Sequence, residues 1–360
     1  MKQQSLKWVG VAFVSTFLAA CGGERTNDPI AVANEQILEA QTAITENQIL
    51  PLVDDFKNDA QTFEQLSSEF CNTPVDEARL SALQDAWKQL ILSWNALEIF
   101  NFGPLYDNIL FPKSIVVNPF REKGVDYHGS VLGDLQAKLA SSDEVTFQQR
   151  EYYNYGLLAL ETLAFESLEA SPSTDSAAII NEYNTSARKC SILQKYAEYM
   201  RSQADYIDYG WNTEYLSEGQ AFKDIYMSGT WNDDSDSTEE LFKAIQSHLD
   251  YMKRRQVLSR TSYLSDTGYP NALAAIESIE KVLEGAPGSG ISLFEIMETA
   301  GFTQEVETVR QNIASAKTAI AAQDQVSFEA AAGLLDGNFK REIPDSLEVS
   351  VGLGSITDGD

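Results

Sequence analysis

The sequence predicts an all-α protein made of two helical bundles packed together. Three observations support this prediction. Apolar residues recur at helical spacing along nearly the whole chain. Glycine, proline and aspartate gather in short joints between these stretches, as they do where helices end. Strand signals are scarce, because no hairpin dipeptide stands between alternating apolar runs and only residues 346–351 have an extended pattern.

The helices follow one another in a regular order. The first covers residues 32–70 and contains Pro51, which is able to kink or break it. The second covers residues 75–100 and ends before Gly103-Pro104, a helix-stop signal. A proline-containing loop follows at residues 105–125. The later predicted helices cover residues 127–139, 145–167, 177–211, 214–227, 238–256, 270–284, 291–300, 303–323 and 326–342.

Composition limits the possible classes of protein. The chain has 360 residues, of which 43% are hydrophobic, so neither a disordered chain nor a multi-spanning membrane protein fits. This length suggests two domains, which we place at residues 32–211 and 212–360. Acidic residues outnumber basic ones by 54 to 26, and the formal charge is -28. Nucleic-acid binding needs clustered positive charge, so we expect no nucleic-acid partner.

The first twenty residues have the organisation of a signal peptide. Lys2 and Lys7 precede a short apolar run, which leads to Leu18-Ala19-Ala20-Cys21. This segment resembles a bacterial lipoprotein signal, which implies cleavage after Ala20, acylation of Cys21 and a tether at residues 21–31. The residue after Cys21 is Gly22 rather than Asp, which in lipoprotein families suggests the outer membrane. The alternative is an ordinary secretory signal that leaves Cys21 free.

Two further cysteines, Cys71 and Cys190, remain in the mature chain. An even number in an oxidising compartment predicts a disulfide between them. The alternative is a pair of buried thiols, since a sequence does not show how close two Cα atoms lie. No CxxC spacing is present and histidine is rare, which disfavours a zinc site.

The second predicted helix carries a stripe of large side chains. Trp87, Ile91, Trp94 and Glu98 follow one another at helical spacing, so two indoles and one carboxylate share a face. One interpretation is purely structural: the stripe belongs to the core, and Glu98 lies at the end that faces solvent. The alternative is that Trp94 and Glu98 belong to a binding site.

A single carboxylate interrupts the most apolar stretch of the mature chain. Residues 156–165 read Gly-Leu-Leu-Ala-Leu-Glu-Thr-Leu-Ala-Phe, and a helix that is apolar all round is normally buried. A buried Glu161 must find a donor, bind a cation or carry a proton, because desolvation disfavours its ionised form. A structural role, with Glu161 satisfied by a Tyr, Trp or Lys side chain, is the alternative.

Other catalytic signals are missing. His248 lies on an apolar helical face, as a packed core histidine does, and His128 begins a helix with no second ligand beside it. The sequence has no nucleophile elbow, no His-Glu-x-x-His, no phosphate loop and no dinucleotide fingerprint.

Several motifs, in this order, resemble the imelysin-like family. The early helix with Trp87, Trp94, Glu98 and Phe100-Asn101-Phe102-Gly103-Pro104 is similar to its Trp, Trp, Glu, Phe-Gly-Pro pattern. Residues 156–165 are similar to its Gly-x-His-x-x-Glu segment, with Gly156 and Glu161 in place. Arg188-Lys189-Cys190 with Trp211 and the end at residues 351–360, with Asp358, complete the resemblance, which covers residues 32–360.

This resemblance implies a mostly helical two-bundle fold, a location in the cell envelope and a link to iron uptake or regulation. It also implies metallopeptidase activity as an alternative function, since the founding member of the family is described as a metallopeptidase. The family histidine, however, falls on Leu158, and a leucine ligates no metal. We therefore expect no peptidase activity through this motif.

The favoured hypothesis is a non-enzymatic envelope lipoprotein. It would bind a metal, such as iron or another divalent cation, or a small ligand in a cleft between the bundles, using Glu98, Glu161, Trp94 and Asp358. Its expected partners are the membrane, through lipidated Cys21, and a ligand or envelope protein. The alternatives are a metallopeptidase with an altered metal shell and an envelope scaffold protein.

The lipid anchor gives the first testable prediction. Cys21→Ala should abolish fatty-acid labelling and release the protein from the membrane fraction, because the acyl chains are attached to this sulfur. Labelling and fractionation of cells that express each form check it. A variant that is still labelled and still sediments with membranes would refute the prediction.

Overall fold

The computed structural model describes residues 31–72, 74–106, 127–147, 154–217, 219–231, 235–286, 288 and 290–350. Within these ranges the regular structure is helical apart from one pair of two-residue strands, which confirms the all-α prediction. The strands β1 (Thr230–Trp231) and β2 (Ser235–Asp236) are antiparallel. None of the helices described is both long and apolar enough to cross a lipid bilayer.

The first half of the chain supplies the longest helices. Its elements are α1 (Asn34–Ile44), the π-helical turn η1 (Thr45–Ile49), α2 (Leu50–Cys71), α3 (Glu77–Leu97), the 3-10 turns η2 (Glu98–Phe100) and η3 (Gly103–Leu105), α5 (Tyr127–Ala140), α6 (Leu157–Phe165), α7 (Ser176–Thr185) and α8 (Ala187–Asn212).

The second half consists of shorter helices. They are α9 (Phe222–Met227), α10 (Ser237–Arg254), α11 (Val257–Arg260), α12 (Gly268–Glu284), α13 (Leu293–Thr299), α14 (Thr303–Ala321), α15 (Gln325–Lys340) and α16 (Glu342–Leu347).

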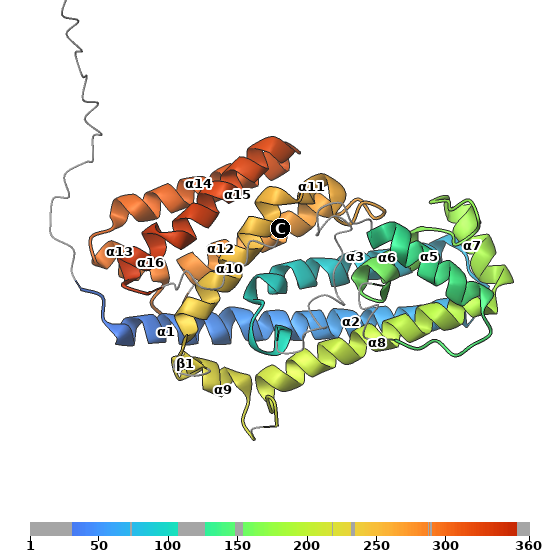
Figure 1. Cartoon of the computed structure of the whole chain (residues 1–360), viewed down its shortest axis with the longest axis horizontal. Coiled ribbons are helices and arrows are strands. Elements are labelled where there is room, and N and C mark those ends of the chain that lie inside the picture. The colour runs from blue at the N-terminus through green and yellow to red at the C-terminus, as the bar shows by residue number, and fades with distance from the viewer. Residues whose placement is uncertain are drawn as a thin grey trace, which may run out of the picture.

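The helices pack in two groups that share one core. In the first group, α2 lies along both α3 and α8, and in the second, α15 packs against α10 and α14 (Figure 1). Helix α12 contacts both α3 and α14, so it joins the groups. The buried hydrophobic side chains of both halves form a single cluster. The predicted domain boundary between residues 211 and 212 therefore stays a prediction.

The first long helical run changes its hydrogen-bond pattern at one turn and stays helical throughout. Pro51 is the second residue of α2, and its missing N–H removes one hydrogen bond from a run that is helical on both sides. The π-helical turn η1 stands immediately before it and connects α1 to α2. The chain thus remains helical from Asn34 to Cys71, and Pro51 does not end it.

Two predicted helices in the first half are wrong in extent. Of residues 145–167, only Leu157–Phe165 form an α-helix among those described, because Gly156 adopts an extended conformation and caps α6. The predicted helix 177–211 is divided at Ser186, whose backbone is extended and whose hydroxyl accepts the Lys189 N–H. A serine at such a joint satisfies the free N–H groups of the next helix.

Two predictions in the second half also need correction. The helix expected at residues 214–227 is limited to Phe222–Met227, since Leu216 and Ser217 have positive φ angles. Ser346 and Leu347, expected to be extended, belong to α16. Their helical conformation buries Leu347 together with Ile343, four residues earlier on the same face.

The Gly103-Pro104 pair packs tightly on the first group. Gly103 has a φ of +53°, and a Cβ at this position would lie 2.3 Å from the Phe222 ring. Pro104 lies against Gly210 of α8, where a Cβ would be 2.8 Å from the proline ring. The motif is thereby explained as a close contact between η3, α8 and α9.

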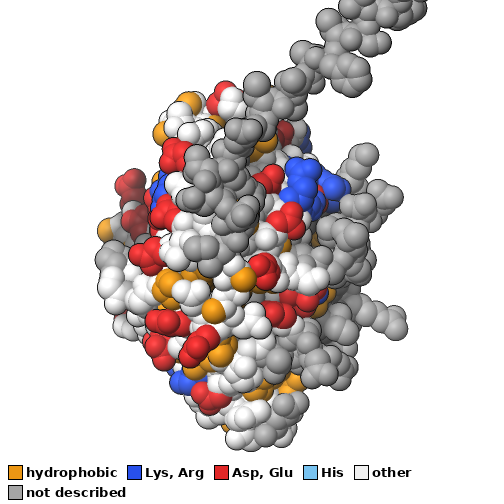
Figure 2. Space-filling model, turned by 90° about the vertical axis from the view of Figure 1, so that its left-hand side faces the viewer, with side chains coloured by type: hydrophobic (Ala, Val, Ile, Leu, Met, Phe, Trp, Pro, Cys, Tyr) orange, Lys and Arg blue, Asp and Glu red, His pale blue; other side chains and the backbone are white. Residues whose placement is uncertain are grey.

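Acidic side chains dominate the visible charged surface. Figure 2 shows many aspartate and glutamate side chains on one face and few basic ones. This distribution agrees with the formal charge of -28.

A disulfide joins Cys71, the last residue of α2, to Cys190 in the first turns of α8. The Cα atoms lie 5.6 Å apart, within the normal range for this bond. The structure therefore confirms the predicted pairing. Its position ties together the ends of two helices that pack along each other.

Removing this bond should weaken the fold. The Cys71→Ser, Cys190→Ser double variant should lose about 2 to 5 kcal/mol of unfolding free energy, because the disulfide closes a loop of 119 residues in the unfolded chain. Urea denaturation without reductant measures the difference. Identical curves for the variant and the wild-type protein would contradict this expectation.

Candidate functional site

Glu161 lies in the interior of the protein. It belongs to α6, which contacts α3, α5, α7 and α8, and all nine residues of this helix are buried. The side chain of Glu161 has 0% exposure. The sequence-based expectation that this carboxylate is buried is therefore confirmed.

The two oxygens of Glu161 have different surroundings. Oε1 accepts hydrogen bonds from the Ser265 N–H at 3.0 Å and from the Ser265 hydroxyl at 2.8 Å. Oε2 is buried and has no hydrogen-bond partner within the described part of the chain. An acceptor left without a donor in a low-dielectric interior is costly, so this oxygen calls for a proton, a cation or a bound donor.

A cluster of polar side chains surrounds Ser265 on the segment that connects α11 to α12. Its hydroxyl lies 2.9 Å from the Thr267 hydroxyl and 2.9 Å from the Ser262 carbonyl oxygen. The amide of Asn271 donates to the hydroxyls of Ser262 and Thr267. Its Oδ1 is a second buried oxygen for which the described residues offer no donor. We call Glu161, Ser262, Ser265, Thr267 and Asn271 the Glu161 cluster.

The backbone between α11 and α12, which carries most of the cluster, adopts unusual conformations. Ser262 and Asp266 adopt positive φ angles, which are uncommon for residues with a side chain. At Gly268, a Cβ would lie 2.5 Å from the Leu258 carbonyl oxygen. Glycine is thus required where α12 begins beside α11.

Burial controls the ionisation of Glu161. Desolvation raises its pKa to about 7, although the hydrogen bonds from Ser265 and the charge of His128 act in the opposite direction. A protonated Glu161 could donate to the Ser265 hydroxyl, which could in turn donate to the Ser262 carbonyl oxygen. The protonated and ionised forms of Glu161 are therefore both populated near neutral pH.

His128 forms a second polar connection beside this cluster. Its Nε2 lies 2.8 Å from a carboxylate oxygen of Glu166, and its ring meets the Tyr263 ring edge to face. Lys189 is buried with 0% exposure, donates to the Glu166 carbonyl oxygen at 3.1 Å and pairs with Glu182. Burial lowers the pKa of Lys189.

Sequence reasoning missed the role of His128 because its partner is 38 residues away. It also missed Ser265, which is 104 residues from Glu161. The run Thr261-Ser262-Tyr263-Leu264-Ser265-Asp266-Thr267 is unusually polar for a stretch between two helices, and this was the available signal.

Glu98 approaches the same connecting segment from another direction. It is buried at the end of α3 and lines a small cavity with His248, Thr261 and Gly268. Glu98 and Glu161 therefore both border residues 261–268. The residues described include no group of three or more His, Cys, Asp or Glu suited to hold a metal. That Glu98 and Glu161 share one ion stays a prediction.

The other predicted site residues have structural surroundings or lie elsewhere. Trp94 is 1% exposed and its ring packs 5.2 Å from that of Phe56. Leu158 is buried one turn before Glu161, and its carbonyl oxygen accepts the Thr162 hydroxyl. Cys21 and Asp358 lie outside the described residues.

The fold and this cluster define a class: an all-helical protein with a buried carboxylate at the contact between helices of its two halves. The model of the imelysin family matches residues 49–346. This chain belongs to the imelysin family.

Two solved structures share the fold. An imelysin-like protein from Psychrobacter arcticum has a TM-score of 0.69 at 17% identity, covering 90% of this chain and 99% of that one. A protein from Parabacteroides distasonis described as an iron-regulated protein A precursor has a TM-score of 0.65 at 11% identity, covering 88% and 96%. No curated protein sequence matches the chain.

The raised pKa of Glu161 predicts a pH-dependent stability. Because the folded-state pKa of about 7 exceeds the ordinary value of 4.5, the folded protein holds this proton more tightly than the unfolded chain. Its contribution is fully present below pH 4.5 and is lost as pH rises through about 7, at an order of 3 kcal/mol.

Glu161→Gln tests this sign, since glutamine keeps the carbonyl acceptor for Ser265 but does not ionise. The unfolding free energy of the variant, relative to wild type, should rise between pH 5 and pH 8. Denaturation curves at both pH values measure it. A constant difference across this range would show that Glu161 does not titrate there.

Proposed function

We propose that this chain is a non-enzymatic binding protein of the bacterial cell envelope that takes up a cation at the Glu161 cluster. The observation that carries this proposal is the buried Oε2 of Glu161, which meets no donor from the described residues. A cation would satisfy this oxygen and would hold the carboxylate in its charged form.

The donor atoms around Glu161 favour a hard cation. Glu161 and Asn271 each offer an oxygen that lacks a donor in the described structure, and Ser262 and Thr267 add hydroxyls beside them. Oxygen donors of this kind suit iron(III), calcium or magnesium better than soft metals. These residues would hold the ion, and Glu98 is a further candidate from the neighbouring small cavity.

Two further observations support the proposal. The Leu18-Ala19-Ala20-Cys21 sequence supports export and a lipid anchor, by which the protein would face the periplasm from the outer membrane. One structural neighbour is described as iron-regulated, which makes iron the first ion to test.

The buried Leu158 disfavours peptidase chemistry. It occupies the position three residues before Glu161, where a helical partner would approach the same ion, and it has no ligating atom. A metal that activates water also needs an open coordination position and several protein ligands. The proposed ligands beside Glu161 are neutral amide and hydroxyl oxygens, which differ from the histidine-containing sets of catalytic metal sites.

Metal titration of the purified protein tests the function. Binding of iron or calcium, measured by calorimetry and by elemental analysis after dialysis, should fall at least about tenfold in Glu161→Gln, because one charged ligand is lost. Glu46→Gln, which removes the same charge from an exposed position, should bind as the wild type does. Equal binding by all three proteins would refute a cation site at Glu161 and favour a scaffold role.

Digestion of unfolded protein substrates tests the absence of peptidase activity. With added iron or zinc, we expect no cleavage above background by the purified chain. Metal-dependent cleavage that disappears in Glu161→Gln would instead support a peptidase with an altered metal shell.

A further inference from the structure

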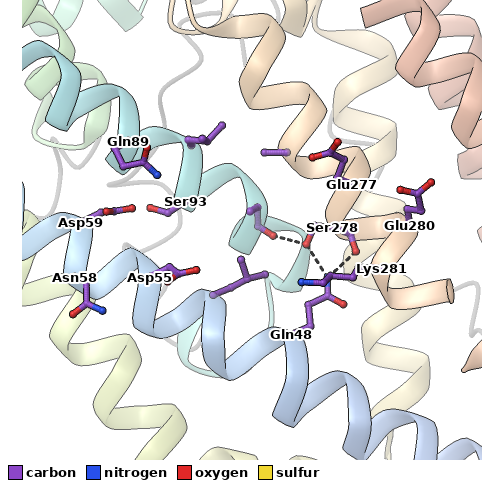
Figure 3. A pocket seen from close by; sticks show the side chains of 14 residues that line it. Gln48, Asp55, Asn58, Asp59, Gln89, Ser93, Glu277, Ser278, Glu280 and Lys281 are labelled. Atoms are coloured by element: carbon purple, nitrogen blue, oxygen red, sulfur yellow. Dashed lines mark hydrogen bonds between the residues drawn. The ribbon is translucent and has the colours of Figure 1, made fainter. Parts of the chain in front are cut away.

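A groove lies between α2, α3 and α12, away from the Glu161 cluster. Its volume is about 620 Å³, which is within the range of small-molecule sites. Figure 3 shows its side chains facing one space from three helices. We call it the α2–α12 groove.

Carboxylates line both sides of this groove. Asp55 and Asp59 come from α2, and Glu277 and Glu280 come from α12, while Lys281 is the one basic residue among the lining residues described. Glu280 also pairs with Lys317, so the other three carboxylates supply most of the negative charge. Asp55 and Asp59, four residues apart, follow each other along one face at a spacing of about 6 Å.

The groove also has apolar lining residues. Leu52, Leu92, Ala96 and Ala274 lie among the polar lining residues. A groove lined by both carboxylates and apolar side chains suits a ligand that has both positive charges and methylene groups. Separated carboxylates do not suit a single compact metal ion, which needs its oxygen ligands within about 2.6 Å.

A buried polar atom at the inner wall points to a bound donor. Gln48 is 3% exposed, and its Nε2 donates to the carbonyl oxygen of Ser278 at 2.7 Å and to the Ser278 hydroxyl at 3.0 Å. These contacts fix the amide beside the groove, as Figure 3 shows. Its Oε1 is buried with no donor among the described residues. An ammonium group at this end of the groove would supply the missing donor.

Asp59 is held in a partly desolvated position eleven residues after Gln48 on the same helical run. Burial raises its pKa, and the Ser93 hydroxyl, which it faces in Figure 3, acts in the opposite direction. A carboxylate in this environment gains from a cation that stays beside it.

We propose that the α2–α12 groove binds a linear aliphatic polyamine, with its ammonium groups on the carboxylates of the groove and its methylene groups on the apolar lining residues. An ammonium group donates several hydrogen bonds and carries full charge at neutral pH, so it matches Asp55, Asp59 and the Gln48 oxygen. The groove shares no lining residue with the Glu161 cluster, so this proposal is independent of the proposed function.

Calorimetric titration with spermidine tests the proposal. The wild-type protein should bind it, with an affinity that falls as salt rises. Asp55→Asn, Asp59→Asn should weaken binding at least about tenfold, because two charge-assisted contacts are lost. Ala274→Phe, which fills part of the groove without changing any charge, should weaken it as well.

The matched control is Glu46→Gln, Asp54→Asn. It removes the same charge from exposed residues of the same helical run that do not line the groove. This variant should bind spermidine within about twofold of wild type at about 0.15 M salt, since exposed charges that make no contact with the ligand are partly screened. Circular dichroism confirms that each variant is folded.

Three results would overturn the proposal. Equal losses in the control and groove variants would show attraction to the acidic surface as a whole. Unchanged binding by both Asp55→Asn, Asp59→Asn and Ala274→Phe would place spermidine elsewhere. Displacement of spermidine by an equal concentration of magnesium would show a site for any dication.

Discussion

Two tryptophans of α3 connect this helix to α2 and to α6, the helix that carries Glu161. Trp94 packs on Phe56 and holds α3 against α2, while the Trp87 indole N–H donates to the Leu157 carbonyl oxygen at 3.2 Å. The second contact fixes the start of α6, on which Glu161 stands four residues later. Helix α3 also packs against α12, and it contributes residues to the lining of the groove between α2 and α12.

The sequence allowed the fold class and part of the site to be predicted, for reasons that are visible in single residues. Glu161 could be singled out because it is the only charged residue in an apolar helix. Cys71 and Cys190 could be paired because they are the two cysteines that follow Cys21. Helix ends at Gly156 and Ser186 were missed because apolar spacing continues on both sides of them. The Ser265 contact was beyond reach, since nothing local to Glu161 marks a partner on a distant loop. Asp55 and Asp59 resemble any solvated helix face until α12 is placed opposite.

The two proposed sites use carboxylates in opposite ways. At Glu161 the carboxyl group is removed from water, so its protonated and ionised forms are close to balanced near neutral pH. In the groove Asp55 and Glu277 are exposed and remain hydrated, and they attract a ligand mainly through their number and spacing. One chain thus carries a carboxylate that is fully buried and a set of carboxylates that lines an open groove.

The π-helical turn at Thr45–Ile49 places one additional residue in an otherwise α-helical run. Each residue turns an α-helix by about 100°, so this turn changes which faces α1 and α2 present relative to each other. It lets α1 contact α9 and α13 while α2 contacts α3 and α8. It also carries Gln48. A one-residue deletion here would hardly change the composition or the hydropathy of the segment. It would, however, rotate α1 relative to α2 and break the contacts of α1 with α9 and α13. The length of this segment is therefore as strongly constrained as any side chain within it.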